Sequence, residues 1–590
     1  MDVNIEVHME EEYSNGDNQQ QKPKNIILCA DGTGNKGGYT PDSNVYKIYK
    51  AVEKEKGVAG IEQIVFYDNG VGTNSNKYLR ALSGGLGFGF GRNVMDLYKF
   101  LARNYHPGDK VYMFGFSRGA STIRAFNGFI RTCGLIDGQA RELSNQALDD
   151  KVKEAFEAYK KRDKKPDIAK AMRERNGMLK QHGVIPIHFT GIWDTVVALG
   201  WPKRTDLASP LSFVLSVLFS VLEKVSNVFF PHAFYNFKLT GNQINAYQAL
   251  ALDDERTAFW PFVWNENLSQ AEESIVTNDD STLIERSVEQ VWFAGMHSNV
   301  GGGYNRSGLA SVPLYWMMGK AQHCGLCFEG DTVEQARKDS HVHGRMYNSR
   351  DGAAIVYRYH PREIESLCML READQSMVER MIEFFFGIKK VDQSRFKDNK
   401  IRLYDSVISR MEHRTANYSP CLIPDKFLIV KDEIQDDLSV TTQSIEVSPH
   451  TQSGWKENKT NIGRMINIRK FMYDVMIAMI LTVVYFAYGY WTCPPEYLGR
   501  SGFMGHVADL LDYILPDFFA GLIEVAVSQN PFLFLAFLST VGLYVCIRSI
   551  IHNHMDTLCQ LKRRKVNAWS EDRWGRHDDH ATSSIEVDHE

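Results

Sequence analysis

A serine between two glycines is the first feature of this sequence whose residue types and spacing could do chemistry. The segment Val111 to Ala120 reads Val-Tyr-Met-Phe-Gly-Phe-Ser-Arg-Gly-Ala, so Gly115, Ser117 and Gly119 form the pattern G-x-S-x-G. An apolar run precedes this pattern and apolar residues at helical spacing follow it, as in the sharp strand-to-helix turn that exposes a nucleophilic serine. Glycine on either side lets the backbone close tightly. The segment therefore predicts that Ser117 is a nucleophile at a helix N-terminus, where the helix dipole favours an oxyanion.

A serine nucleophile needs a base that takes its proton and a buried acid that orients the base. Asp194 directly follows the apolar run Val184 to Trp193, and His297 lies just after the apolar run Gln290 to Ala294. Histidine is the side chain that titrates near neutral pH. The chain order of serine, aspartate and histidine is that of the α/β-hydrolase triad. We therefore expect Ser117, His297 and Asp194 to form a catalytic triad.

Two choices around this triad stay open from the sequence. Asp253 and Asp254 compete with Asp194 for the role of the acid. The oxyanion hole should use the backbone N–H of Arg118, the residue after the nucleophile, and one N–H from the loop after the first strand. In that loop, Gly32 and Thr33 are the candidates.

Elements that could position these residues alternate between strands and helices. Asn25 to Ala30 and Gln63 to Tyr67 are apolar runs typical of buried strands, and Arg92 to Tyr105 has apolar residues on one helical face. This alternation predicts an α/β fold, an α/β-hydrolase-like and mainly parallel sheet with helices on both faces. In such sheets, active sites lie beyond the carboxyl ends of the strands.

Composition excludes several other classes of function. The formal net charge of -5 gives no indication of nucleic-acid binding, so no nucleic-acid partner is predicted. The cysteines and histidines lack zinc-site spacing, so we expect no metal and no cofactor. Residues 1–24 are polar and acidic without an apolar core, which predicts a disordered leader rather than a signal peptide.

Two stretches near the C-terminus predict membrane spans. Val475 to Trp491 and Val525 to Ile547 carry no charged residue, and a span needs about 20 apolar residues. Basic residues flank the outer ends of the pair and acidic residues predominate between the two stretches, so both termini and the catalytic domain should face the cytoplasm. A hairpin buried in a soluble core is the alternative. The predicted organisation is a hydrolase domain (25–430), a linker (431–470), a transmembrane hairpin (471–551), and a basic and polar cytoplasmic tail (552–590).

A third apolar run, Leu211 to Leu222, is too short to span a membrane. It is either a lid or lipid-facing helix over the active site, or a helix buried in the core.

Five motifs in order resemble a known family. They are Ile-Leu-Cys-Ala-Asp-Gly-Thr-Gly-Asn, Gly-Phe-Ser-Arg-Gly-Ala, Ile-Trp-Asp-Thr-Val, Ala-Leu-Ala-Leu-Asp-Asp-Glu-Arg and Phe-Ala-Gly-Met-His-Ser-Asn-Val-Gly-Gly-Gly-Tyr. Over about residues 25 to 430, the chain is similar to an α/β-hydrolase family of once-unknown function that includes the Tle-type phospholipase effectors of type VI secretion. The resemblance implies a triad of Ser117, Asp194 and His297 that hydrolyses phospholipid acyl esters. The chain departs from the family pattern at Asn299, where aspartate is usual. If that carboxylate tunes the histidine, the pH optimum of this enzyme would differ.

The leading functional hypothesis is a membrane-anchored serine hydrolase that cleaves acyl esters of phospholipids, with a phospholipid substrate and the lipid bilayer as partners. An esterase or thioesterase acting on a soluble or protein-linked acyl group is the alternative within the same chemistry. A membrane toxin or sensor whose hydrolase domain is only a scaffold is the alternative without enzyme activity. Protein partners cannot be predicted from the sequence.

Overall fold

The computed structural model describes most of the chain. The described residues are 22–54, 60–70, 89–139, 143–162, 165–175, 185–196, 237–266, 286–371, 396–434, 440–492, 502–514 and 520–574. The predicted leader, apart from residues 22–24, and the run Leu211 to Leu222 lie outside these residues.

A large sheet forms the centre of the molecule. Within the described residues it has nine strands in the order β11-β10-β9-β6-β5-β4-β3-β1-β2. All neighbouring strands run parallel except β10 and β11, which pair antiparallel at one edge. The bounds of the strands, including a separate β7-β8 pair, are β1 (Asn25–Ala30), β2 (Gln63–Asp68), β3 (Lys110–Phe116), β4 (Ile187–Trp193), β5 (Gln243–Ala251), β6 (Ser287–Phe293), β7 (Met369–Arg371), β8 (Phe396–Asp398), β9 (Arg402–Tyr404), β10 (Phe427–Ile434) and β11 (Val440–Val447).

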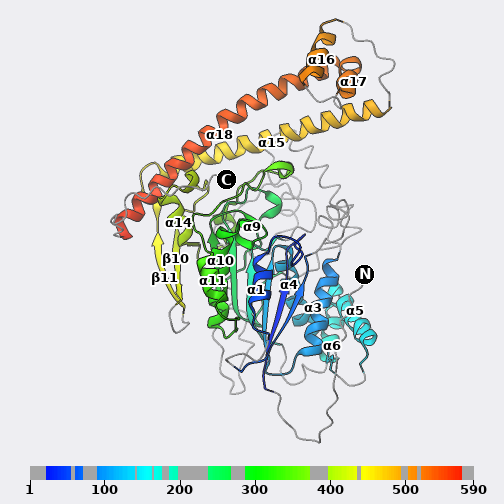
Figure 1. Ribbon diagram of the computed structural model, residues 1–590, viewed down its shortest axis with the longest axis vertical. Coiled ribbons are helices and arrows are strands. Elements are labelled where there is room, and N and C mark those ends of the chain that lie inside the picture. Colours follow the sequence, from blue (N-terminus) through cyan, green and yellow to red (C-terminus); the bar gives the residue numbers. More distant parts are fainter. Residues whose placement is uncertain are drawn as a thin grey trace, which may run out of the picture.

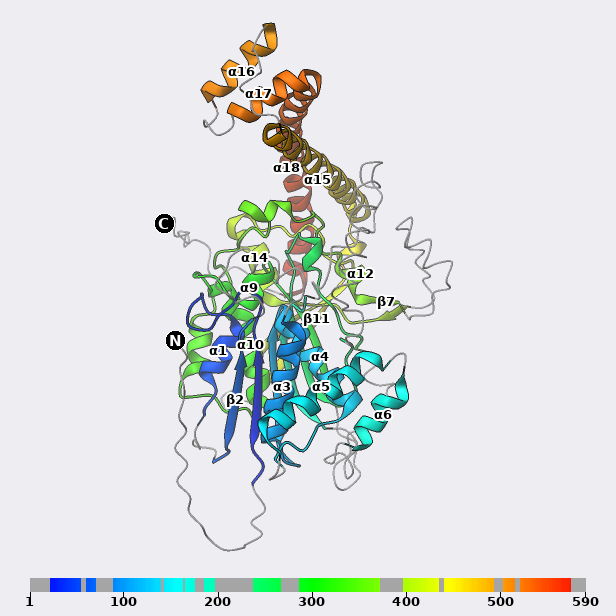
Figure 2. The ribbon, with the colours of Figure 1, turned by 90° about the vertical axis from the view of Figure 1, so that its right-hand side faces the viewer.

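Helices cover both faces of this sheet (Figures 1 and 2). In β1, Ile26 and Leu28 pack with α3, α4 and α5, whereas Ile27 and Cys29 pack with α1, α10 and α11 on the opposite face. Burial on both faces explains the continuous apolar run of this strand. The predicted fold class, an α/β-hydrolase-like fold, is confirmed. The helices of this part are α1 (Asn44–Ala51), α3 (Phe90–Asn104), α4 (Arg118–Cys133), α5 (Asn145–Lys161), α6 (Pro166–Arg175), α9 (His297–Gly301), α10 (Gly308–His323), α11 (Thr332–Lys338), α12 (Ile364–Cys368) and α14 (Asp405–Glu412), with short 3-10 turns η2 (Thr257–Phe259), η3 (Gly352–Val356), η5 (Thr415–Asn417) and η6 (Pro449–Thr451).

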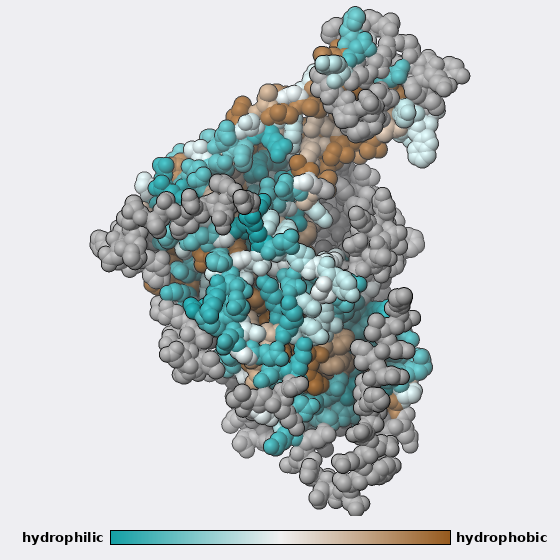
Figure 3. All heavy atoms as spheres, viewed as in Figure 1, coloured by the Kyte–Doolittle hydropathy of each residue, from teal (hydrophilic) through white to brown (hydrophobic). Residues whose placement is uncertain are grey.

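The C-terminal part is a helical hairpin that projects from the sheet domain. Helices α15 (Trp455–Thr492) and α18 (Pro531–Trp574) form its two arms, and α16 (Gly502–Ile514) and α17 (Ala520–Gln529) lie at its tip (Figures 1 and 2). Among the described residues, α15 and α18 are the two helices long and apolar enough to cross a membrane. Hydrophobic residues gather along these arms, while the sheet domain presents a mainly hydrophilic face (Figure 3).

The segment 431–470, which we expected to be a linker, contains regular structure in its described residues. It includes the end of β10, all of β11 and the first turns of α15. The sheet therefore continues to Val447, beyond the expected domain end at residue 430. Strand β11 contains Thr, Gln, Ser and Glu, and it lies at the edge of the sheet, where polar and charged residues are tolerated.

The expected cytoplasmic tail is also structured as far as Trp574. In that region, α18 packs against the sheet domain through a cluster that contains Met555, Leu558 and Cys559 together with Tyr359 and Ile462. Polar contacts add to this packing: Lys562 Nζ of α18 donates to the Ile423 carbonyl (2.9 Å), and Lys459 Nζ of α15 pairs with Asp425 Oδ2 (2.7 Å). The inner ends of both arms are thus fixed to the domain that carries the candidate site.

Candidate active site

Ser117 lies at a sharp turn between β3 and α4. Its φ of 56° is in the left-handed region, which a residue other than glycine adopts only under strain. A Cβ atom on Gly119 would lie 2.0 Å from the Ala30 carbonyl oxygen, and one on Gly115 would lie 2.7 Å from the Ala120 Cα. Both positions therefore require glycine, because the neighbouring backbone leaves no room for a side chain.

His297 and Asp194 lie next to Ser117. The Ser117 Oγ is 2.8 Å from His297 Nε2, and Asp194 Oδ2 is 2.5 Å from His297 Nδ1. Asp194 follows β4 and His297 begins α9 after β6, so both come from the carboxyl ends of parallel strands. All three residues are buried. The chain thus brings a hydroxyl, an imidazole and a carboxylate into one line of hydrogen bonds.

The two alternative acids hold the backbone near the histidine. Asp254 Oδ2 accepts the backbone N–H of His297 (3.2 Å), and the same carboxylate pairs with the Arg256 guanidinium (2.6 Å). Asp253 Oδ2 accepts the Gly295 N–H (2.6 Å). Both carboxylates therefore shape the loop that carries the histidine, while Asp194 contacts its ring.

Arg362 is a site residue that the sequence analysis missed. Its Nη1 donates to Asp194 Oδ1 (2.6 Å) and its Nη2 to Asp194 Oδ2 (2.7 Å), in a bidentate and fully buried pair. Arg362 also donates to the Ala251 and Phe259 carbonyls at 2.5 Å each. No motif surrounds Arg362, and it lies 168 residues from Asp194 along the chain, so sequence spacing gave no signal.

Burial and charge set the protonation states of the pair. Burial alone would raise the pKa of Asp194, but the charge of Arg362 and the hydrogen bonds from His297 and Arg362 hold that pKa well below its usual range. Burial lowers the pKa of His297, and its contact with Asp194 offsets only part of this effect. At neutral pH, an ionised carboxylate therefore faces a neutral imidazole, which is able to accept a proton.

The loop after β1 lies beside the nucleophile turn. A Cβ atom on Gly32 would lie 2.8 Å from the ring of Phe116, the residue before Ser117. The Gly32 N–H donates to Asp31 Oδ1 (2.6 Å), and Asp31 is held in turn by the hydroxyls of Ser43 and Tyr67. Of the two candidates in this loop, Gly32 therefore already has a partner for its N–H.

The chain is similar to known proteins over the part that carries this geometry. Residues 24–320, half of the chain, match the family described as type VI secretion system (T6SS), phospholipase effector Tle1-like, catalytic domain. The chain belongs to this family. Residues Ser117, Asp194 and His297 lie inside the matched range, whereas Arg362 and the helical hairpin lie beyond it.

Two individual proteins are similar to parts of the chain. An uncharacterized protein of Saccharomyces cerevisiae, YEL023C, is 30% identical over 196 residues, which cover 30% of this chain and 27% of that protein. The chain thus matches about a quarter of the length of this relative. A crystal structure of an uncharacterized protein from Pseudomonas aeruginosa covers 57% of this chain and 50% of its own, with 15% identity and a TM-score of 0.28.

Asn299, where this Tle1-like domain departs from the expected family pattern, contacts backbone rather than the histidine ring. Its Nδ2 donates to the Arg345 carbonyl (3.1 Å), and its Oδ1 accepts the Tyr347 N–H (3.1 Å). These two bonds attach the start of α9 to the neighbouring loop, and they need both the donor and the acceptor of an amide.

Proposed function

We propose that this protein is a membrane-anchored serine hydrolase that cleaves acyl esters of phospholipids. The observation that carries the proposal is the continuous relay from Ser117 Oγ through His297 to Asp194, in a chain that belongs to a phospholipase effector family. Family membership supports a lipid-hydrolysing enzyme, and the relay supports the chemistry assigned to it.

In the proposed mechanism, the Ser117 hydroxyl attacks the carbonyl carbon of the acyl ester while His297 Nε2 takes the hydroxyl proton. Asp194 stabilises the imidazolium that forms. The tetrahedral intermediate then collapses, and the imidazolium returns its proton to the departing alcohol oxygen. An acyl ester on Ser117 remains, and a water molecule activated by His297 hydrolyses it to a free fatty acid.

The proposed oxyanion hole combines the N–H of Arg118, at the N-terminus of α4, with the N–H of Thr33. Support for Arg118 is its position directly after the nucleophile on a helix that begins at that residue. We prefer Thr33 to Gly32 because the Gly32 N–H already donates to Asp31.

We further propose that α15 and α18 cross a membrane and leave the sheet domain on the cytoplasmic side. Large apolar side chains on these helices are exposed, among them Val484 (57%), Trp491 (86%) and Ile550 (69%). Exposed apolar surface of this extent is unusual for a soluble protein. Arg469 precedes the first charge-free stretch and Arg548 follows the second, which favours a cytoplasmic location of both outer ends.

The test is a product analysis of defined phospholipids. We expect the full-length protein to release fatty acid and lysophospholipid from vesicles, detected by mass spectrometry, and Ser117→Ala to release neither. A wild-type protein that cleaves short thioesters but leaves phospholipids intact would favour the esterase or thioesterase alternative. No hydrolysis of either substrate by folded protein would favour a scaffold.

A further inference from the structure

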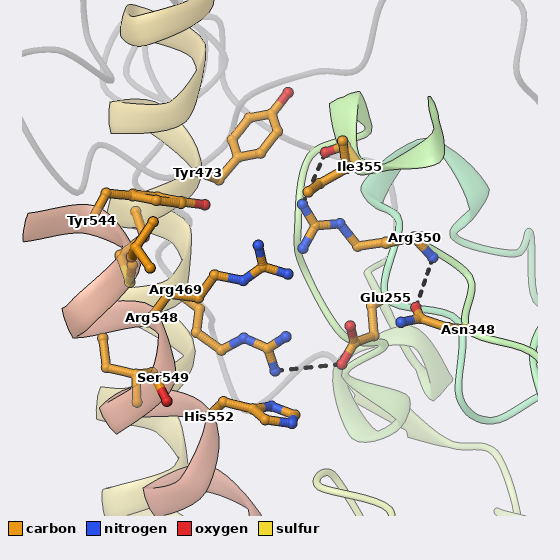
Figure 4. Close-up of a pocket in the computed structure, with 13 residues that line it drawn as sticks. Glu255, Asn348, Arg350, Ile355, Arg469, Tyr473, Tyr544, Arg548, Ser549 and His552 are labelled. Atoms are coloured by element: carbon orange, nitrogen blue, oxygen red, sulfur yellow. Dashed lines mark hydrogen bonds and ion pairs between the residues drawn. The ribbon is translucent and has the colours of Figure 1, made fainter. Parts of the chain in front are cut away.

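A cavity lies where the helical hairpin meets the sheet domain, separate from the residues around Ser117. Its volume is about 480 Å³, and it opens between α15 and α18 on one side and residues of the sheet domain on the other (Figure 4). Arg469 and Tyr473 reach it from α15, and Tyr544 and Arg548 reach it from α18. Glu255 and Arg350 face them from the sheet domain, as Figure 4 shows.

Positive charge exceeds negative charge in this cavity. Arg469 Nη1 lies 3.6 Å from Glu255 Oε1, and the Arg469 guanidinium stacks on the Tyr359 ring at 4.0 Å. Arg350 donates to the carbonyls of Ile355 (3.0 Å) and Tyr357 (3.3 Å) and makes no ion pair within 4.0 Å with another residue that the structure describes. Arg548 is exposed, and its side chain has no hydrogen bond or ion pair with any other residue that the structure describes. The lining of the cavity thus contains three guanidinium groups and one carboxylate.

The cavity also has an apolar end. Met472, Tyr473, Tyr544 and Val545 line it on the side toward the tip of the hairpin, within or next to the charge-free stretches of α15 and α18. If these stretches span the bilayer, the three arginines lie at the level of the lipid headgroups and the apolar lining lies at the start of the hydrocarbon. A charged region next to an apolar region matches the arrangement of headgroup and acyl chains in a phospholipid.

We propose that this cavity binds the phosphate-bearing headgroup of an anionic phospholipid, at a site distinct from the one that cleaves substrate. Guanidinium groups recognise phosphate through charge-assisted hydrogen bonds, and basic pockets between spanning helices are suited to headgroups. The proposal rests on the proposed membrane insertion of α15 and α18, but it does not depend on catalysis by Ser117.

A lipid in this cavity would contact the loop that leads to the candidate active site. Arg350 and Tyr473 hold that loop through the carbonyls of Ile355 (3.0 Å) and Val356 (2.8 Å). The next residue, Tyr357, packs edge-on against Phe259, whose ring lies 5.1 Å from that of His297. A bound headgroup would therefore contact the same arginine and tyrosine that hold this loop beside the candidate active site.

The test measures lipid binding by native mass spectrometry of full-length protein in detergent. All proteins carry Ser117→Ala, so that the proposed nucleophile cannot consume the probe lipid. Phosphatidic acid is the anionic probe, phosphatidylcholine the zwitterionic probe and glycerol 3-phosphate the soluble phosphate. We expect phosphatidic acid to bind more tightly than the other two. Equal binding of phosphatidylcholine would overturn the requirement for an anionic headgroup, and equal binding of glycerol 3-phosphate would overturn the assignment to a lipid.

Variants test whether phosphatidic acid binds in this cavity. Arg548→Gln should weaken phosphatidic acid binding about fivefold, and Arg548→Lys should retain most of it. Glu255→Gln removes the one carboxylate among the three arginines and should tighten binding about fivefold, a gain that misfolding cannot produce. Arg464→Gln, on α15 but outside the cavity, is the matched control and should leave binding unchanged. The proposal is wrong if Arg548→Gln and Glu255→Gln both bind like their parent, or if Arg464→Gln loses as much as Arg548→Gln.

Discussion

At the scale of single residues, the contacts of three aspartates separate their roles. Asp194 contacts the His297 ring, whereas Asp253 and Asp254 contact the backbone around it. We predict that Asp194→Asn lowers kcat by about four orders of magnitude, because an amide donates to the imidazole and selects the wrong tautomer. Hydrolysis of a short-chain ester measures this loss. A larger loss of kcat in folded Asp254→Asn than in Asp194→Asn would contradict the assignment.

We predict that the charge of Arg362 weakens the attraction of the Asp194 carboxylate for the proton on His297. Because burial lowers the pKa of His297, the acidic limb of the kcat/KM profile should lie below the ordinary histidine value of about 6.5. Arg362→Gln removes the positive charge paired with Asp194, so the carboxylate stabilises the imidazolium more and the limb should move to higher pH. The same change leaves a buried carboxylate unpaired and should lower stability by about 3–5 kcal/mol.

The pH profile of Arg362→Gln is best compared with that of Arg345→Gln, an exposed arginine outside the relay. Only the Arg362 variant should shift the acidic limb. An unchanged limb, or one that moves to lower pH, would show that Arg362 does not act through Asp194.

The extent to which the site could be predicted differs from residue to residue. Ser117, Asp194 and His297 each come shortly after an apolar run typical of a strand, so local pattern was enough to select them, and the structure places them within hydrogen-bond distance. Arg362 comes from a segment without such a pattern, and only the fold brings it to Asp194. The choice between Gly32 and Thr33 depended on the hydrogen bond from the Gly32 N–H to Asp31, which the sequence pattern does not reveal.

At the scale of elements, apolar periodicity predicted the central strands and helices, but it did not predict the polar strands at one edge of the sheet. The helix expected at Arg92 to Tyr105 is α3, Phe90–Asn104, and the first strand has the expected bounds. The edge strand β11 and the second half of its neighbour β10 contain many polar residues, so the segment resembled a linker. The basic run after residue 561, which we expected in a polar cytoplasmic tail, belongs to α18, where Lys562 is buried and bonds to the Ile423 carbonyl.

The inner half of α18 should therefore stabilise the sheet domain. Leu558 is 7% exposed in the cluster with Tyr359, whereas Leu561 on the same helix is 41% exposed. We predict that Leu558→Ala costs about 2–5 kcal/mol of unfolding free energy, and that the matched Leu561→Ala costs much less. Thermal unfolding of the detergent-solubilised protein measures both. Equal Tm values for the two variants would mean that α18 does not pack on the domain.

At the scale of the whole molecule, the hairpin is proposed as a membrane anchor that keeps the catalytic end of the sheet near lipid. Protein covers little of the apolar surface of α15 and α18. Of the most apolar 18-residue segment in each helix, 28% is buried in α15 and 11% in α18. We predict that the full-length protein fractionates with membranes and resists alkaline carbonate extraction, because spanning helices are held by hydrocarbon rather than by charge. Release of the protein by carbonate would contradict spanning and would indicate that the hairpin packs against another protein surface.

The most direct test of the central claim is to trap the acyl group on Ser117. The full-length protein is mixed with vesicles of a phospholipid whose fatty acids carry an isotope label, quenched with acid and digested, and the peptide that contains Ser117 is measured by mass spectrometry. We predict a mass increase equal to the labelled acyl group on Ser117 in the wild-type protein, and no labelled peptide and no fatty acid release with Ser117→Ala. Fatty acid release at the wild-type rate by Ser117→Ala would contradict it.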